Sequence, residues 1–309
     1  MKPHMARHIP LGGPTGRREI RNRCALAAAL DARLPQVRGR DRLLQLLRGS
    51  MLPRALQCDT LVRWGPGLEA TVNPSLDGSL RALYVAQWVR PALVPVLEAC
   101  LEPGDLFVDV GANIGVYASW GAKIVGPTGT VLALEPVPRT RAWLEQIRAQ
   151  NGLENVKVIA TAAGEGEGSA WMQTTDGASG LSTLASEREP GIQVAITTLD
   201  HLLGSRVPAL IKIDVEGHEL SVLRGARHIL RTTRVPIVFE APDFGGGSNT
   251  IDCVRLLEST GYRVLSLTPR GVRAFHPVGY SHNLLAIDAG DGTIEARLQG
   301  ARFLRSQNT

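Results

Sequence analysis

The residues best suited to chemistry in the first half of the chain form a short loop that contains two glycines. The apolar segment Phe107-Val-Asp-Val110 runs directly into Gly111-Ala-Asn-Ile-Gly115. Glycine lets the backbone turn tightly and come close to a ligand, and ligands of open α/β sheets bind beyond the carboxyl ends of the strands. The pattern Gly-x-Asn-x-Gly therefore predicts a loop that holds a small charged cofactor at a strand end.

Two cofactors fit such a loop, a dinucleotide and S-adenosylmethionine. Asn113 stands where the dinucleotide pattern Gly-x-Gly-x-x-Gly has its second glycine, and Asp109 would repel a pyrophosphate but attract the ammonium group of methionine. Glu135 ends the next apolar segment and suits the hydroxyls of a ribose, while Ala163 follows the third, where the adenine should lie. These residues favour S-adenosylmethionine, with a dinucleotide or a loop that only packs a helix as alternatives. The predicted cofactor-binding residues are Asp109, Gly111, Ala112, Asn113, Gly115, Glu135, Pro136 and Ala163.

A second group of polar residues follows the apolar segment 210–213. Asp214 ends that segment, and Glu216 and His218 lie in the turn before the next helix. If a methyl group from such a cofactor goes to a hydroxyl, the transfer requires an aligned oxygen and a group that removes its proton. His218 suits that base because the ordinary pKa of histidine lies near neutrality, and Asp214 could orient it or contact the hydroxyl. The alternative is that these side chains only cap or stabilise the helix start.

Lys212 interrupts an otherwise apolar strand. Central parallel strands are covered on both faces, so a lysine there is expected to be buried and to need a charged partner. Asp214 or Glu240 could supply that partner. A structural ion pair is the favoured interpretation, because most such networks are not catalytic, and Lys212 is retained as a catalytic candidate beside Asp214, Glu216 and His218.

The same acids allow a second kind of site. Asp214, Glu216 and Glu240 offer the hard oxygen ligands that Mg²⁺ or Mn²⁺ prefers, and such an ion could lower the pKa of a bound hydroxyl. Acids after a strand commonly serve the helix start instead, so a metal is kept as an alternative and is not favoured. We expect Glu240 and Ser182, which lies in a loop between two weak strand signals, to contact the acceptor.

Strand and helix patterns alternate from residue 101, which predicts an α/β fold with a doubly wound, mostly parallel sheet. The tail segments Tyr262–Leu267 and Asn283–Ile287 lack a helical pattern between them and predict an antiparallel hairpin at one sheet edge. The expected fold is a seven-stranded sheet with an antiparallel last strand. Expected strands cover 105–110, 130–134, 156–160, 170–173, 193–197, 210–213 and 236–239, and expected helices 114–123, 139–150 and 218–230.

Charge is spread unevenly over the 309 residues. Residues 1–50 carry eleven basic and three acidic side chains, a net +8, against +5 for the whole chain, so the rest carries −3. We expect a basic, partly helical segment over 1–54, an extended and helical lead-in over 55–100, and the catalytic domain over 101–309. The basic segment is interpreted as a solvated appendage, with nucleic acid or an anionic surface as the alternative partner. Four scattered cysteines and no transmembrane segment predict a cytoplasmic protein, and a homo-oligomer is left open.

The chemical segments together resemble the FkbM-like methyltransferase family. The resemblance rests on Phe107-Val-Asp-Val-Gly-Ala-Asn-Ile-Gly115, Leu134-Glu-Pro136, Thr198-Leu-Asp200 and Ile211-Lys-Ile-Asp-Val-Glu-Gly-His-Glu-Leu220, and continues through Val222-Leu-Arg-Gly-Ala226. It implies a class I, Rossmann-like fold that uses S-adenosylmethionine for O-methylation of a hydroxyl. The implied acceptor is a sugar, a glycolipid or a polyketide-type secondary metabolite. An RNA methyltransferase that uses the basic segment is the alternative function.

Overall fold

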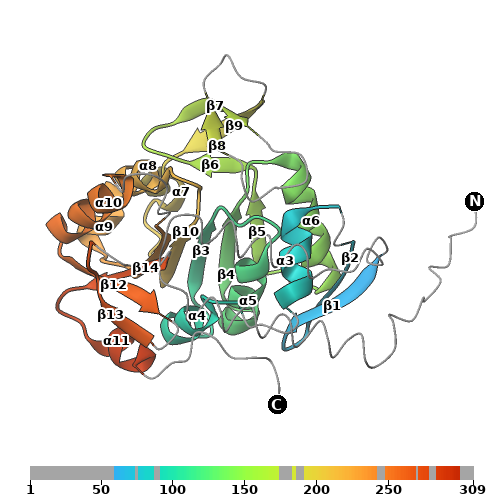
Figure 1. Ribbon diagram of the computed structural model, residues 1–309, viewed down its shortest axis with the longest axis horizontal. Helices are drawn as coiled ribbons and strands as arrows, with labels where there is room; N and C mark the ends of the chain where they lie inside the picture. The colour runs from blue at the N-terminus through green and yellow to red at the C-terminus, as the bar shows by residue number, and fades with distance from the viewer. Residues whose placement is uncertain are drawn as a thin grey trace, which may run out of the picture.

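The computed structural model describes residues 59–73, 76–86, 91–173, 183–185, 191–241, 248–268, 271–277 and 283–299. The predicted basic segment 1–54 and the predicted acceptor contact Ser182 lie outside these residues. A sheet of eight strands occupies the centre of the described part, with helices on both of its faces (Figure 1).

The central sheet has the order β13-β12-β14-β11-β10-β3-β4-β5. Strands β5, β4, β3, β10 and β11 run parallel, and β14 runs antiparallel to both β11 and β12. Because successive strands are added on opposite sides of β3, the order reverses between β3 and β10, and a crevice is expected beyond their carboxyl ends. The strand bounds are β3 (Leu106–Val110), β4 (Thr130–Leu134), β5 (Val156–Ile159), β10 (Leu210–Ile213), β11 (Ile237–Glu240), β12 (Tyr262–Thr268), β13 (Gly271–Ala274) and β14 (Asn283–Asp288).

Two hydrophobic cores lie on the two faces of this sheet. Side chains alternate across a strand, so Phe107 faces one core and Val108 the other. The Phe107 core contains residues of α3 (Gly78–Ala86), α4 (Val94–Cys100), α5 (Val116–Val125), α6 (Pro138–Gln150) and α11 (Thr293–Leu298). The Val108 core contains residues of α7 (Leu199–Leu203), α8 (Glu219–Arg224), α9 (Arg227–Thr232) and α10 (Ser248–Ser259). None of the helices in the described residues has the length and apolarity that crossing a bilayer requires.

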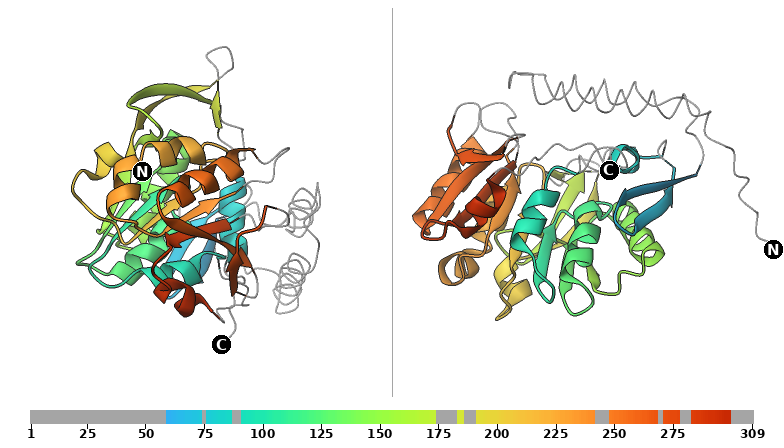
Figure 2. Two further views of the ribbon diagram at one scale, coloured as in Figure 1. Left: turned by 90° about the vertical axis from the view of Figure 1, so that its left-hand side faces the viewer. Right: turned by 90° about the horizontal axis from the view of Figure 1, so that it is seen from below.

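Two smaller sheets accompany the central one. The hairpin β1 (Thr60–Gly65) and β2 (Leu68–Val72) docks on α6, where the Asn151 amide accepts from the backbone N–H of Glu69 at 2.9 Å and donates to its carbonyl at 2.8 Å. It lies at the opposite end of the molecule from the β12–β13–β14 region (Figures 1 and 2). A four-stranded sheet of β6 (Thr161–Ala163), β9 (Ile192–Thr197), β7 (Gly168–Gln173) and β8 (Thr183–Ala185) stands beside the carboxyl end of β5.

The structure corrects two sequence predictions. The antiparallel pair β12–β14 exists, but β13 adds an eighth strand outside it and occupies the sheet edge, so the seven-stranded prediction is wrong by one strand. The single helix predicted over 218–230 is two helices, α8 and α9. It breaks because the carbonyl of Gly225 accepts from the backbone N–H of Asp200, while the Asp200 carboxylate accepts from the backbone N–H groups of His228 and Ile229 and starts α9.

Candidate active site

The glycine loop is tightly bent and packs against the turn after β10, which carries Asp214 and Glu216. Gly111, Asn113 and Gly115 have φ angles of 72°, 53° and 86°, in the left-handed region that favours glycine. The Asn113 side chain supports its own conformation by accepting from the backbone N–H of Ile114 at 2.8 Å. A Cβ on Gly111 would lie 1.9 Å from the carbonyl oxygen of Asp214. The loop and the end of β10 are therefore in direct backbone contact, which no side chain at position 111 would permit.

A cavity of about 210 Å³ opens at the carboxyl ends of β3, β4, β10 and β11. It occupies the predicted crevice at the reversal of strand order. Nine of the predicted site residues line it: Gly111, Asn113, Glu135, Pro136, Ala163, Asp214, Glu216, His218 and Glu240. The structure thus brings the predicted cofactor residues and the predicted acceptor-side residues to one cavity.

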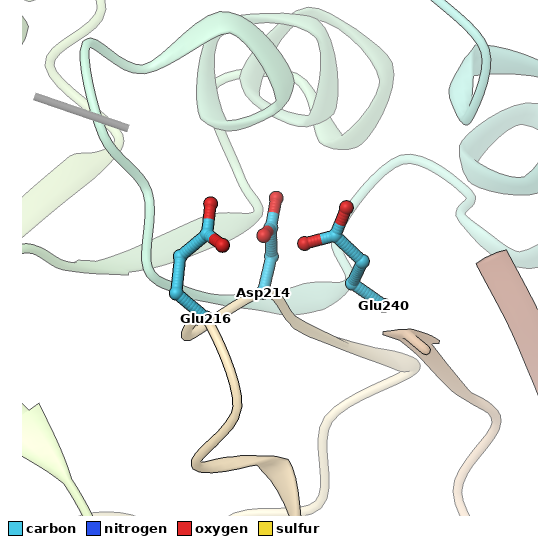
Figure 3. Close-up of side chains that lie close together, drawn as sticks. All are labelled: Asp214, Glu216 and Glu240. Atoms are coloured by element: carbon cyan, nitrogen blue, oxygen red, sulfur yellow. The ribbon is translucent and has the colours of Figure 1, made fainter. Parts of the chain in front are cut away.

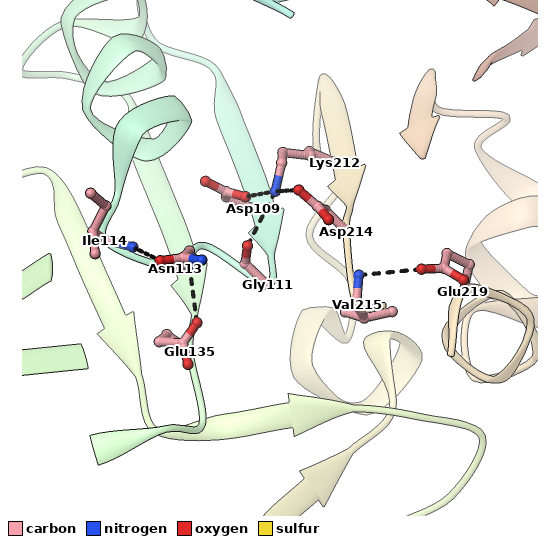
Figure 4. Close-up of polar contacts among 9 residues, drawn as sticks. All are labelled: Asp109, Gly111, Asn113, Ile114, Glu135, Lys212, Asp214, Val215 and Glu219. Carbon is pink, nitrogen blue, oxygen red and sulfur yellow. Dashed lines mark hydrogen bonds and ion pairs between the residues drawn. The ribbon is translucent and has the colours of Figure 1, made fainter. Parts of the chain in front are cut away.

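Lys212 and Asp109 lie beneath the cavity and do not line it. The Lys212 ammonium is 3.0 Å from Asp109 Oδ1, 3.2 Å from the carbonyl oxygen of Gly111 and 3.4 Å from Asp214 Oδ2 (Figure 4). It also sits over the Tyr117 ring, 5.5 Å from the ring centroid. Burial by itself would lower the pKa of Lys212, but the two adjacent carboxylates outweigh it and raise that pKa. Asp109 is fully buried, because it faces the α5 side of β3, and its charge is matched by Lys212 instead of being presented to the cavity.

Gly115 and Ala112 have packing environments of their own. Gly115 begins α5, and a Cβ there would lie 3.1 Å from Leu144 on α6, so the residue lets α5 and α6 pack closely. Ala112 is buried and belongs to the hydrophobic core on the α5 face. Neither is among the residues that line the cavity.

Glu135 joins the end of β4 to the glycine loop. Its Oε2 accepts from the backbone N–H of Asn113 at 3.0 Å (Figure 4). Its Oε1 accepts from the backbone N–H of Val137 at 2.9 Å. Burial raises the pKa of this carboxyl to about 7, against the opposing effect of the two N–H donors. Each carboxylate oxygen can accept a second hydrogen bond, so Glu135 can hold the loop and still accept from a ribose hydroxyl.

Three carboxyl groups converge where β10 and β11 end at the cavity. Oxygens of Asp214, Glu216 and Glu240 lie within 4.8 Å of one another (Figure 3), because β10 and β11 are parallel neighbours that end at the same edge. Burial, and then repulsion from Asp214, raise the pKa of Glu216 to about 7 and that of Glu240 to about 10. Glu240 therefore keeps a proton at neutral pH and shares a hydrogen bond with Asp214.

His218 lies at the same end of the cavity with the properties of a base. Burial lowers the pKa of its imidazole below the ordinary value, so the neutral form, which can accept a proton, predominates at pH 7. Glu216, two residues earlier, has a φ angle of 49°. A left-handed conformation costs a non-glycine residue about 1–2 kcal/mol, so the turn that places Glu216 and His218 must be held by other contacts.

The block Thr198-Leu-Asp200, which contributed to the family resemblance, supports helices and does not face the cavity. The Thr198 hydroxyl accepts from the backbone N–H of His201 at 3.0 Å and caps α7. Asp200 caps α9 at 2.8 and 3.1 Å. These side chains satisfy helix N–H groups that have no partner within the helix.

Some residues of the site were not predicted from the sequence. Val137, Ala162 and Met172 line the cavity and form an apolar wall with Val194, which is part of the same small hydrophobic cluster. Met172 lies on β7, in a sheet that the strand signals only weakly indicated. Its approach to the cavity depends on the pairing of β7 with β9 and of β9 with β6, the strand that carries Ala162 and Ala163. No spacing in the sequence marks it as a site residue.

Three features together define the class I, S-adenosylmethionine-dependent methyltransferases. They are a glycine loop after the first strand of a parallel sheet whose strand order reverses, an acid at the end of the second strand, and an antiparallel last strand. The family model for the FkbM methyltransferase domain matches residues 109–264, about half of the chain. The chain therefore belongs to the FkbM methyltransferase family and, as a member, is an S-adenosylmethionine-dependent methyltransferase.

Two curated relatives and one solved structure are similar to parts of this chain. Methyltransferase 1 of Beauveria bassiana is 29% identical over 188 residues, covering 52% of this chain and 74% of that protein. The hexuronic acid methyltransferase AglP of Haloferax volcanii is 28% identical over 162 residues, covering 50% of this chain and 62% of that protein. The crystal structure of an FkbM methyltransferase from Methylobacillus flagellatus is 19% identical with a TM-score of 0.44, covering 68% of this chain and 55% of that one. This chain thus spans less than two thirds of AglP and of the solved FkbM protein.

Proposed function

We propose that the protein transfers a methyl group from S-adenosylmethionine to a hydroxyl of a sugar, a glycolipid or a polyketide-type secondary metabolite. The observation that carries the proposal is that the glycine loop and the turn with Asp214, Glu216 and His218 line one cavity. The name of AglP, a hexuronic acid methyltransferase, supports a sugar as the acceptor class.

The described residues fit S-adenosylmethionine along the length of the cavity. Gly111 and Asn113 would face the methionine end, Glu135 the ribose, and the apolar wall around Ala162 and Met172 the adenine. When bound, this cofactor supplies an electrophilic methyl group on a positively charged sulfur. The acidic lining of the neighbouring cavity wall suits that positive charge.

The acceptor-side residues would align the hydroxyl and take its proton. Glu240 keeps its proton and shares it in a hydrogen bond with Asp214, so the remaining oxygens of this pair can accept from hydroxyl groups of the acceptor and orient it. His218 is the residue that receives the hydroxyl proton, since its imidazole is neutral at pH 7. Lys212 would hold Asp214 in place from below, at 3.4 Å, without touching the acceptor.

The three carboxyl groups also suit a divalent cation, which is the second candidate arrangement for this end of the cavity. The two arrangements differ in a simple measurement. With His218 as base and Glu240 protonated, methyl transfer should survive removal of metal ions by EDTA. Loss of transfer after EDTA, restored by Mg²⁺ or Mn²⁺, would assign the acids to a metal.

Binding and transfer assays test the proposal. Calorimetry should detect binding of S-adenosylhomocysteine, and methyl-labelled S-adenosylmethionine should label a pool of hexoses, hexuronic acids and alkyl glycosides. His218→Gln should bind S-adenosylhomocysteine as the wild type does but lose about 10²- to 10⁴-fold in kcat. His201→Gln, an exposed histidine on α7, is the matched control and should keep full turnover.

Three results would count against the proposal. Failure of the wild type to bind S-adenosylhomocysteine would remove the cofactor assignment. Full turnover of His218→Gln would remove the assigned base. Labelling of RNA in place of every sugar acceptor would support the alternative function.

A further inference from the structure

The turn between β10 and α8 is held from outside the cavity by a buried carboxylate, that of Glu219. This side chain is 1% exposed. Its Oε1 accepts from the backbone N–H of Gly217 at 3.0 Å and from that of Val215 at 3.4 Å, the second of which is drawn in Figure 4. The carboxylate therefore ties two points of the turn to the first residue of α8.

Asn249, in the first turn of α10, completes this network. Its Nδ2 donates to Glu219 Oε2 at 3.1 Å and to the carbonyl oxygen of Gly217 at 2.8 Å. Helices α8 and α10 pack side by side (Figure 1). One amide group thus bridges the two helices and the turn, and it uses both of its N–H bonds to do so.

The turn needs such support because its backbone is unusual. Glu216 and the following Gly217 both have positive φ, 49° and 94°. A glutamate rarely adopts this conformation, and without external bonds the turn would relax to a more common one. In the observed conformation the Glu216 carboxylate points toward Asp214 and Glu240 (Figure 3).

We infer that Glu219 and Asn249 are positioning residues that set the acceptor-side wall of the cavity through the turn 215–218. Neither side chain lines the cavity, whereas Val215, Glu216 and His218 all do. The inference rests on the proposed function, because it assigns the two residues to the cavity that would bind S-adenosylmethionine. It extends the site to α10, a helix none of whose described side chains lines the cavity.

Binding of S-adenosylhomocysteine tests the inference without knowledge of the acceptor, because the Asp214 carbonyl and the Val215 side chain, at the start of the turn, pack against Gly111 of the glycine loop. Removing the His218 imidazole leaves this packing in place, whereas loosening the whole turn disturbs it. Asn249→Ala and Glu219→Gln should each weaken this binding about 10-fold or more, in the range that partners of site residues usually contribute. Asn249→Asp keeps the size of the side chain but replaces its N–H donors with acceptors, so it should bind as weakly as Asn249→Ala. If Glu219→Gln does not fold, the two variants of the half-buried Asn249 carry the test.

Asp200→Ala is the matched control, because it removes a carboxylate that likewise accepts from two backbone N–H groups but supports α9 away from the cavity. It should lower the melting temperature and leave the Kd within about twofold of the wild type. Wild-type affinity in Asn249→Asp would overturn the inference, as would a loss in Asp200→Ala equal to that in the Asn249 variants. Absence of binding in the wild type would overturn the proposed function, and the inference with it.

Discussion

Replacement of Lys212 by methionine should strongly destabilise the protein, because the lysine neutralises a carboxylate that water cannot reach. Lys212 is 2% exposed and Asp109 is fully buried, with 3.0 Å between the ammonium and Oδ1. Methionine keeps most of the apolar volume of lysine and removes the charge and the N–H donors. Among the residues that the structure describes, Asp109 then has no opposite charge beside it.

The magnitude follows from the burial of the pair. Removing one partner of a buried ion pair typically costs about 3–5 kcal/mol, out of about 5–15 kcal/mol for the stability of a whole domain. The exposed pair Arg63–Glu69, at 2.7 Å, provides a matched control because its side chains are 70% and 50% exposed. An exposed pair contributes about 0–1 kcal/mol, so Arg63→Met should change the free energy of unfolding very little.

The loss in Lys212→Met should also depend on pH. Burial already raises the pKa of Asp109, and Lys212 opposes that shift, so removing the lysine raises the pKa further. A carboxyl whose folded pKa exceeds its unfolded value contributes stability below the unfolded pKa and loses it as pH rises through the folded pKa. The variant should therefore be closest to the wild type near pH 4 and should fall behind it toward pH 8.

Urea denaturation of four variants measures these effects. Lys212→Met and Asp109→Asn are compared with the double variant, which should lose less than the sum of the two because no unpaired charge remains. Arg63→Met completes the set. A loss in Lys212→Met no larger than in Arg63→Met, or strict additivity in the double variant, would refute the argument that Lys212 balances a buried charge.

Two further predictions concern the cofactor end of the cavity. Gly111→Ala should lose binding of S-adenosylhomocysteine and several kcal/mol of stability, because its Cβ would meet the Asp214 carbonyl at 1.9 Å. Gly152→Ala, with a similar φ angle and open space around it, should cost only about 1–2 kcal/mol. Equal losses of the two variants in urea denaturation would disprove the packing argument. Glu135→Gln should weaken S-adenosylhomocysteine binding in calorimetry and should also remove a pH dependence of the folding stability. The folded pKa of about 7 lies above the ordinary 4.5, so wild-type stability should decline from pH 4.5 to 7 through this group. A variant whose stability shows the same decline would contradict the assignment.

Much of the sheet could be predicted from local patterns. The strands at 130–134 and 210–213 were predicted with their observed bounds, because apolar runs flanked by turn residues mark buried parallel strands. The break between α8 and α9 could not be predicted, since it depends on Asp200, a residue outside the broken segment that supplies the cap of α9. The strand β13 was missed because a short edge strand of four residues carries little apolar pattern.

The site was predictable where its residues follow strand ends. Parallel strands end at the same edge of a sheet, so the sequence predicts that Glu135, Asp214 and Glu240 meet, and all three line one cavity. Asp109 and Lys212 are partners in the β3–β10 register and lie two residues before that edge, within the strands. Their side chains alternate to the α5 face and form a buried pair, which spacing along the chain did not distinguish from a pair facing the cavity.

The sequence alone determined the class of the protein, because the features of that class require particular residue types at particular positions. These features are the glycine loop, the acid at the end of the second strand and the Lys-Ile-Asp-Val-Glu-Gly-His-Glu block. Only the tertiary structure decided how those residues divide their work. Whether a carboxylate lines the cavity, keeps a proton or neutralises a lysine depends on its burial and on the charges within a few ångströms, and these neighbours come from other strands. The supporting contact of Asn249 with Glu219 likewise joins positions 30 residues apart, and only the packing of α10 against α8 brings them together.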